Sequence, residues 1–253
     1  MLLKWNTNYV VQNQYKLPSV ANSMLTFSNG RDIACGMTDN SILIFNSTSN
    51  QINKVLAGHQ SKVTSLALLG DVFLASGSQD LTLKIWNLTA AAEFYSFQVN
   101  QYNSESVNAL AVLKTGQLAA GTDFSYIYIY DLNGLVKVMS LLSNIFSLCE
   151  LESGYLASGL ANGMIEIWDV MSSSLISRLG GHMNIVRSLV VLRNGYLASG
   201  SDDQTVRVWD TELNKHVMTL TGHSGNVVSL IVLSNGYLAS GSRDTTVKIW
   251  SFF

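Results

Sequence analysis

Short apolar runs separated by turn residues recur along the whole chain. Near its end, residues 227–233 are apolar at almost every position, and residues 237–242 are mostly small. A short run that is apolar at consecutive positions predicts a strand buried on both faces. The pair Asn235-Gly236 lies between the two runs, and Asn-Gly is a strong signal for a tight β-hairpin. The pattern therefore predicts an all-β protein built from short antiparallel strands.

The pattern repeats at a nearly constant interval. A Gly-His pair, an apolar strand, a hairpin, a small-residue strand and a closing strand follow one another in residues 58–86, 181–209 and 222–250. A period near 40 residues with four strands per repeat is the signature of a propeller blade. The sequence predicts six repeats in one domain over residues 1–253, closing at intervals of 38 to 44 residues near Phe45, Trp86, Tyr130, Trp168, Trp209 and Trp250.

These repeats resemble the WD40 family over nearly the whole chain. The resemblance implies an all-β propeller of six four-stranded blades. Few residues follow Trp250, so the last repeat lacks a fourth strand of its own. Family members of this kind close with a strand from the start of the chain, and we expect residues 8–17 to pair beside residues 246–250. The alternative is that Trp5, which stands in register with the series, belongs to an array of seven or more blades.

A set of histidine, serine and aspartate recurs in three repeats and has the residue types of a hydrolase triad. Three copies argue against catalysis, and the chain has no Gly-x-Ser-x-Gly motif. A tryptophan follows each set in the sequence. The family resemblance implies that these residues form a structural hydrogen-bond network and not a catalytic triad. We expect this network to contain His59, Ser76, Asp80, Trp86, His182, Ser199, Asp203, Trp209, His223, Ser240, Asp244 and Trp250. The sequence leaves open whether Ser76 or Ser78 makes the contact.

Three repeats depart from this pattern. The fourth has Leu141 where others carry the histidine and Asn162 in place of the aspartate. The first and third repeats have also lost the Gly-His pair. We expect these three blades to be the less stable ones.

Composition narrows the classes of ligand. The chain has 15 basic and 17 acidic residues, a net charge of −2 and no basic cluster, so we expect neither nucleic acid nor a membrane surface as partner. The four histidines are too far apart in the repeats for a metal site, and no phosphate-binding loop is present. We therefore expect no catalytic residues, no cofactor, no metal and no small-molecule substrate.

The start of the chain lacks the apolar segment of a secretory signal, and no apolar run approaches the roughly 18 residues of a membrane span. Its two cysteines, Cys35 and Cys149, are too few for a disulfide scaffold. We expect an intracellular protein, cytoplasmic or nuclear.

The family resemblance also implies a partner-binding rim, near the Gly-His loops and the turns between second and third strands. Matching positions carry aromatic, aliphatic and charged residues of both signs, and aromatic and arginine side chains are the types that anchor interfaces. The candidate rim residues are Lys62, Gln79, Phe124, Phe146, Ile185, Arg187, Asp202 and Arg243. The predicted function is a non-catalytic scaffold that binds a peptide or a partner domain. The alternative is a substrate-recruiting segment of a larger protein, such as a ubiquitin ligase or a signalling complex.

Overall fold

The computed structural model describes residues 2–5, 11–15, 17–99 and 106–251, which form 25 strands and no helix. The chain divides into two compact units, residues 1–110 and residues 111–253, and each is described by itself. The division falls within β11 (Val107–Val112). Every pairing between neighbouring strands along the chain is antiparallel, as the hairpin signals predict.

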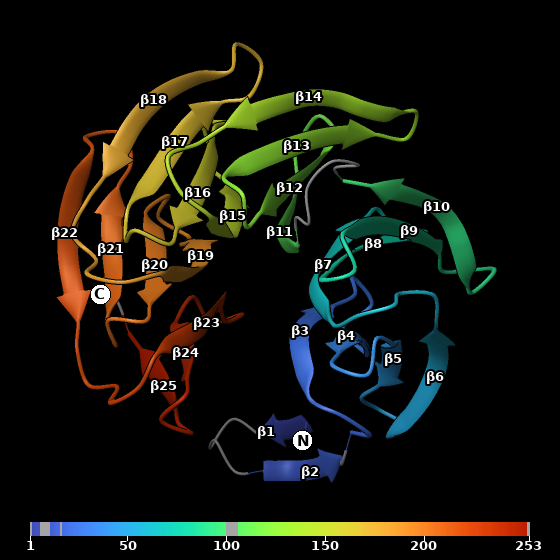
Figure 1. Ribbon diagram of the computed structural model, residues 1–253. Helices are drawn as coiled ribbons and strands as arrows, with labels where there is room; N and C mark the ends of the chain where they lie inside the picture. Colours follow the sequence, from blue (N-terminus) through green and yellow to red (C-terminus); the bar gives the residue numbers. More distant parts are fainter. Residues whose placement is uncertain (1, 6–10, 16, 100–105, 252–253) are drawn as a thin grey trace. The chain divides into compact units, whose positions relative to one another are not determined.

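The first unit contains two four-stranded sheets and a hairpin (Figure 1). The hairpin pairs β1 (Leu2–Trp5) with β2 (Val11–Tyr15). The first sheet is formed by β3 (Ala21–Thr26), β4 (Asp32–Met37), β5 (Ile42–Asn46) and β6 (Gln51–Leu56). The second sheet is formed by β7 (Val63–Leu69), β8 (Phe73–Ser78), β9 (Thr82–Asn87) and β10 (Ala92–Gln98).

The second unit continues the series, with β11 joining its first sheet. That sheet adds β12 (Leu118–Thr122), β13 (Tyr126–Asp131) and β14 (Gly134–Ser140). The next sheets are β15 (Ile145–Glu150), β16 (Leu156–Leu160), β17 (Ile165–Asp169) and β18 (Ser174–Leu179), then β19 (Val186–Val191), β20 (Leu197–Ser201), β21 (Val206–Asp210) and β22 (Lys215–Leu220). The last sheet is β23 (Val227–Val232), β24 (Leu238–Ser242) and β25 (Val247–Trp250). Within this unit, β15, β19 and β23 lie on the inner side and β14, β18 and β22 on the outer side (Figure 1).

The sheets are propeller blades, and β19–β22 shows how such a blade buries both of its faces against its neighbours. In the blade β19–β22, Trp209 packs against Ile165, Ile167 and Leu179 of the preceding blade. Val206 and Val208, which point the other way along the same strand, pack with Val227 and Leu238 of the following blade. This two-sided burial explains the apolar runs, and the predicted all-β fold of six propeller blades is confirmed.

The small residues of the second strands reflect a close approach between blades. A Cβ on Gly200 of β20 would stand 2.7 Å from the Val227 Cγ1, and one on Gly159 of β16 would stand 2.7 Å from the Val186 Cγ1. Both distances are shorter than real Cβ contacts, so only glycine fits. In both places the first residue of a first strand thus sits on a glycine of the preceding blade.

A one-residue bulge marks the start of the first strand in five blades. In β19, Val186 pairs with Ser201 and Ser188 pairs with Gly200, which leaves Arg187 without a partner in the ladder. A bulge of this kind bends the strand and re-aims the extra side chain. The bulged residues are Asn22, Thr64, Phe146, Arg187 and Val228.

The start of the chain differs from the expected closure. Residues 8–10 and 16 lie outside the described residues, but β2 pairs with β1 in a two-stranded sheet of its own. Among the described strands, the last blade therefore has three strands, and five blades have four. A hairpin closes only a short loop, whereas pairing with the far end of the chain closes a long one, so the local pairing costs less entropy.

Candidate interaction site

Three blades carry the same hydrogen-bonded chain of side chains. In β7–β10, the indole N–H of Trp86 donates to Ser76 Oγ over 2.8 Å, and this oxygen lies 2.7 Å from His59 Nε2. His59 Nδ1 lies 2.7 Å from Asp80 Oδ2. Because Ser76 Oγ accepts from the indole, its proton is free for Nε2, and Nδ1 then donates to the carboxylate. The same chain joins His182, Ser199, Asp203 and Trp209, and again His223, Ser240, Asp244 and Trp250.

The structure distinguishes the two serines that the sequence left open. Ser76 makes the contact with the histidine, while Ser78 Oγ donates to the Ser61 carbonyl and accepts from the Asp80 amide. Ser76 is fully buried, with its oxygen engaged by both rings. A serine enclosed in this way offers no path for a substrate carbonyl, so the geometry is that of a structural network.

The aspartates of the network are held in their charged form. Burial alone would raise the pKa of Asp80, but hydrogen bonds from His59, Thr82 and the Gln60 amide outweigh it and hold the pKa well below its usual range. The pKa of Asp203 is lowered in the same way against burial, chiefly by hydrogen bonds from His182 and Thr205. The charged carboxylates therefore fix the loop before each first strand.

The fourth blade has lost this chain of hydrogen bonds. Leu141 is buried, and the Ser158 hydroxyl donates to the Glu166 carbonyl instead. The indole nitrogen of Trp168 is buried and has no hydrogen-bond partner among the described residues. An unsatisfied buried donor is a cost that the three complete blades avoid.

Four of the candidate rim residues lie together at the start of two neighbouring first strands. Arg187 donates from Nε and Nη2 to the two carboxylate oxygens of Asp202, over 2.8 and 2.6 Å. Its guanidinium carbon stands 4.9 Å from the centre of the Phe146 ring, a cation–π geometry. The Asp202 amide donates to the Ile185 carbonyl over 2.9 Å. We call Phe146, Ile185, Arg187 and Asp202 the Arg187 cluster.

Within the Arg187 cluster, the positive charge of Arg187 is paired with a carboxylate of the same rim. The Arg187 side chain is 24% exposed and that of Asp202 only 7%, so the arginine charge is neutralised in place. Phe146 and Arg187 are both bulge residues, and the bulges aim them at one another across two blades. The sequence identified these residues but offered no signal that they pair.

The remaining candidates are not drawn into such a cluster. In the first unit, Lys62 and Gln79 are exposed and are joined through a backbone hydrogen bond of 3.0 Å. In the second unit, Arg243 is exposed in the turn after β24, and Phe124 is 50% exposed in the turn after β12. These four side chains are available to a partner.

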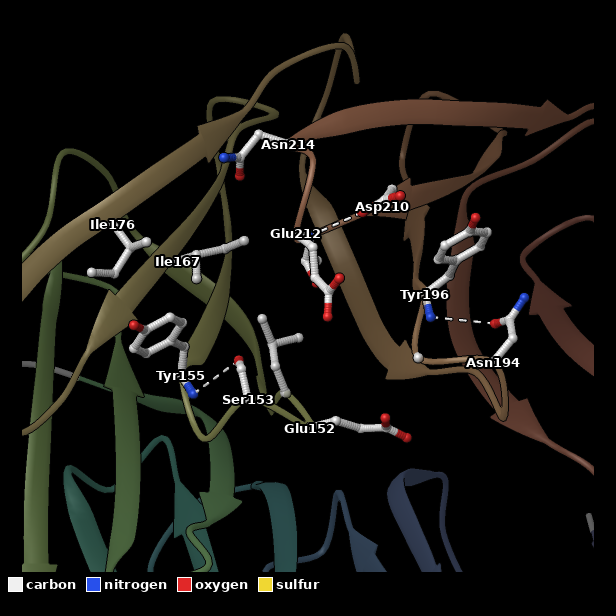
Figure 2. A pocket seen from close by; sticks show the side chains of 13 residues that line it. Glu152, Ser153, Tyr155, Ile167, Ile176, Asn194, Tyr196, Asp210, Glu212 and Asn214 are labelled. Carbon is white, nitrogen blue, oxygen red and sulfur yellow. Dashed lines mark hydrogen bonds between the residues drawn. The ribbon is translucent and has the colours of Figure 1, made fainter.

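A groove that the sequence did not indicate opens between the blades β15–β18 and β19–β22. It encloses about 320 Å³ and is lined by two tyrosines, Tyr155 and Tyr196, and by the acidic residues Glu152, Asp210 and Glu212 (Figure 2). Lysine and arginine are absent from its lining residues. The groove lies at the ends of β15 and β19, whereas the Arg187 cluster lies at their beginnings.

Two further features are absent from the described part of the chain. Nowhere in these residues do three or more histidine, cysteine, aspartate or glutamate side chains gather in a metal-binding arrangement. The same residues include no helix long and apolar enough to span a membrane.

Three segments match the sequence profile of the WD40 family, described as WD domain, G-beta repeat: residues 50–87, 173–210 and 214–251. The chain contains WD40 repeats. Each matched segment ends one residue after a network tryptophan, namely Trp86, Trp209 or Trp250. The WD40 profile thus selects the three blades that hold the complete hydrogen-bond chain.

Proteins similar to this chain include "Pre-mRNA-processing factor 19 homolog 2" of Arabidopsis thaliana, 28% identical over 62% of this chain and 31% of that protein. Another is "WD repeat and HMG-box DNA-binding protein 1" of Mus musculus, 28% identical over 63% of this chain and 15% of that protein. The chain therefore spans less than a third of these relatives. Among solved structures, the WD40 β-propeller domain of Doa1 matches with a TM-score of 0.82 and 25% identity, covering 91% of this chain and 78% of that one.

Proposed function

We propose that this WD40 chain is a non-catalytic protein-interaction scaffold and that the Arg187 cluster forms part of its binding rim. The observation that carries the proposal is the arginine held over Phe146 by a two-pronged contact with Asp202. Arginine and aromatic side chains are enriched among the residues that dominate binding energy. A side chain already ordered before binding loses less entropy in the complex.

The partner is a protein or a peptide. Lys62, Gln79, Phe124 and Arg243 are exposed in loops and turns equivalent to those of the cluster, and they extend the proposed rim within their own units. Their mixed character fits an irregular protein surface better than a uniformly charged polymer. Nucleic acid, membranes and small-molecule substrates are excluded from the proposal, although one relative carries "DNA-binding" in its name. A filter-binding assay with labelled duplex DNA and single-stranded RNA at 150 mM salt tests this exclusion, and retention of either would contradict it.

The absence of catalysis belongs to the same proposal. The three Ser–His–Asp sets use their polar atoms within the blades, and they leave no serine oxygen for a nucleophilic step. An intracellular location is also part of the proposal. Both cysteines are free thiols, and burial raises the pKa of Cys35 to about 11. A thiol with so high a pKa is chemically inert.

A second candidate is a substrate-recruiting segment of a larger protein. The observation that favours it is the short share of each relative that the chain covers, 31% in one and 15% in another. An antibody raised against this chain would measure the mass of the native protein in the source cells. A band near 27.6 kDa excludes the second candidate, and a much larger one supports it.

The rim is tested by quantitative capture from a lysate of the source organism. Phe146→Ala and Arg187→Ala are compared with the unsubstituted chain and with Lys215→Ala, which removes an exposed charge on the outer strand β22. A partner lost with both rim variants and retained with Lys215→Ala supports the proposed rim. Equal capture by all four baits of matched thermal stability would contradict it.

A further inference from the structure

In two grooves between blades, a lysine of the chain itself reaches the next blade. In the first unit, Lys54 of β6 donates its ammonium to the Leu88 carbonyl in the turn after β9. In the second unit, Lys137 of β14 donates to the carbonyls of Val170 and Met171, over 2.8 and 2.6 Å, in the turn after β17. In both cases a lysine on a fourth strand reaches across to the next blade and caps a turn.

The groove between β15–β18 and β19–β22 lacks this lysine. Lys54 pairs with Ile44, Lys137 pairs with Ile129, and the residue at the same register of β18 is Ser177, which pairs with Ile167. The Ser177 hydroxyl is buried and has no hydrogen-bond partner among the described residues. The turn it faces begins after Trp209, where Thr211 corresponds to Leu88 and Val170. A serine is too short to reach that turn, so no lysine of the chain enters this groove, which we call the open groove.

The walls of the open groove suit a cation. Glu152, Asp210 and Glu212 line it, and within the ranges that the structure describes none of them forms an ion pair. The Glu212 side chain stands between Tyr155 of one blade and Tyr196 of the other (Figure 2). Oxygen Oε2 of Glu152 reaches the opposite hairpin, 3.4 Å from where a Gly195 Cβ would lie. Carboxylates bind an ammonium group, and tyrosine faces accommodate both the charge and the methylene stem of a lysine.

The equivalent groove of the first unit, which Lys54 lines, shows how carboxylates in such a groove can be bonded by the chain itself. There Asp32 accepts hydrogen bonds from the amides of Asn29, Asn46 and Asn53, and Asp71 accepts one from the Ser28 hydroxyl. Lys54 completes it. The carboxylates of Asp32 and Asp71 are thus bonded from within the chain. In the open groove, Asp210 accepts from the backbone amides of Glu212 and Leu213, whereas the carboxylates of Glu152 and Glu212 form no ion pair among the described residues.

We propose that the open groove binds a lysine side chain presented by an extended segment of a partner protein. The ammonium takes the place that Lys54 and Lys137 occupy in the other grooves, near the Thr211 carbonyl and the carboxylates of Glu152 and Glu212. The methylene stem lies along Tyr155 and Ile176. The site stands at the opposite end of the strands from the Arg187 cluster, and it does not depend on the function proposed for that cluster.

The decisive variant is Ser177→Lys, which gives the groove its own lysine. The probe is the peptide acetyl-Ala-Ala-Lys-Ala-Ala-amide, titrated into the full chain while backbone amide resonances of Tyr155, Gly195 and Glu212 are followed by NMR. We expect saturable shifts for the unsubstituted chain and at least about tenfold weaker binding for Ser177→Lys, with a melting temperature equal to or higher than that of the unsubstituted chain. Thr219→Lys is the matched control: it adds the same charge on the exposed outer strand β22 and leaves the groove open.

Two further comparisons separate a lysine site from unspecific attraction. The same peptide with norleucine in place of lysine keeps the stem without the charge, and we expect about tenfold weaker binding. Glu212→Gln with Glu152→Gln removes the charge of the walls and should weaken the lysine peptide by a similar factor. Absence of saturable shifts in the unsubstituted chain, equal binding of the two peptides, or unchanged binding by a folded Ser177→Lys variant would each overturn the proposal. Loss of rim binding in the capture experiment leaves these outcomes unaffected.

Discussion

Asp202 holds both the Nε and the Nη2 of Arg187, over 2.8 and 2.6 Å. The pair is largely buried, so its attraction is less screened by solvent than that of a surface pair. Its geometry fixes the guanidinium against Phe146 and leaves little of its charge exposed. The pair therefore determines what the proposed rim offers to a partner.

Asp202→Asn should lower the free energy of unfolding by about 1–3 kcal/mol, because it leaves a partly buried guanidinium with a neutral acceptor. Urea denaturation measures the change. Glu212→Gln is the control, since its carboxylate is exposed and has no ion pair among the described residues, and we expect it to stay within about 0.5 kcal/mol of the parent. Equal stabilities for the two variants would contradict the pairing.

The network histidines should differ from the fourth histidine of the chain. His182→Ala strands Ser199 and Asp203 inside the blade and should cost about 1–3 kcal/mol. His216→Ala removes an exposed ring on β22 and should cost less than about 0.5 kcal/mol. Thermal melts of the two variants against the parent check this, and indistinguishable melting temperatures would rule out a stabilising network.

The same tryptophan substitution should have unequal effects in two adjacent blades. Trp209→Phe loses an indole N–H that donates to Ser199, whereas Trp168→Phe removes an N–H with no partner in the described structure. Both variants lose similar volume, so we expect Trp209→Phe to be the more destabilising by about 1 kcal/mol. Chemical denaturation of both proteins measures the difference, and the reverse order would refute the assignment of partners.

Stability should fall in acid as the network aspartates take up protons. In the folded state the pKa of Asp203 lies below its ordinary value of 3.8. The folded chain therefore binds fewer protons than the unfolded chain in this range of pH. The stabilisation from this group is complete above the unfolded pKa and is lost as the pH falls below about 4 toward the folded pKa. Urea midpoints between pH 6 and pH 2.5 should show a shallower acid decline in Asp203→Asn than in the parent. Parallel declines would exclude Asp203 as a source of the acid sensitivity.

The repeat pattern in the sequence predicted most of the fold. Consecutive apolar positions and Asn-Gly turns predict strands because they act over a few residues, and the period of the closing aromatic residues predicted the number of blades. The choice between Ser76 and Ser78 was not available, since two residues apart on a strand place both side chains on the same face. The pairing of β2 was missed because a local hairpin and a distant strand present the same backbone groups to it.

The candidate sites were less accessible to sequence reasoning. Arg187 and Phe146 were identified by position, but a bulge in each strand sets the direction in which they point. The open groove depends on the absence of a lysine at one register position of β18. The hairpins before the fourth strands differ in length, so this position is not at a constant distance from the closing residue: Lys54 lies nine residues after Phe45, whereas Lys137 lies seven after Tyr130. Ser177 lies nine residues after Trp168, at the offset of Lys54, and the observed strand pairing is needed to align Lys137 with both of them.

The repeated bulge has a consequence for how such a chain diversifies. The residues at the five bulges are an amide, a hydroxyl, an aromatic ring, a guanidinium and an aliphatic group. None of them faces a partner in its ladder, so strand pairing itself places no demand on their chemistry. Three of them bond through their side chains instead: Asn22 donates to the Val63 carbonyl, Thr64 to the Gly77 carbonyl, and Arg187 to Asp202. Mutation at a bulge can therefore change what a blade displays without breaking a strand pair, and a library confined to Phe146 and Val228 would vary recognition while the hydrogen bonds of Asn22, Thr64 and Arg187 stay in place.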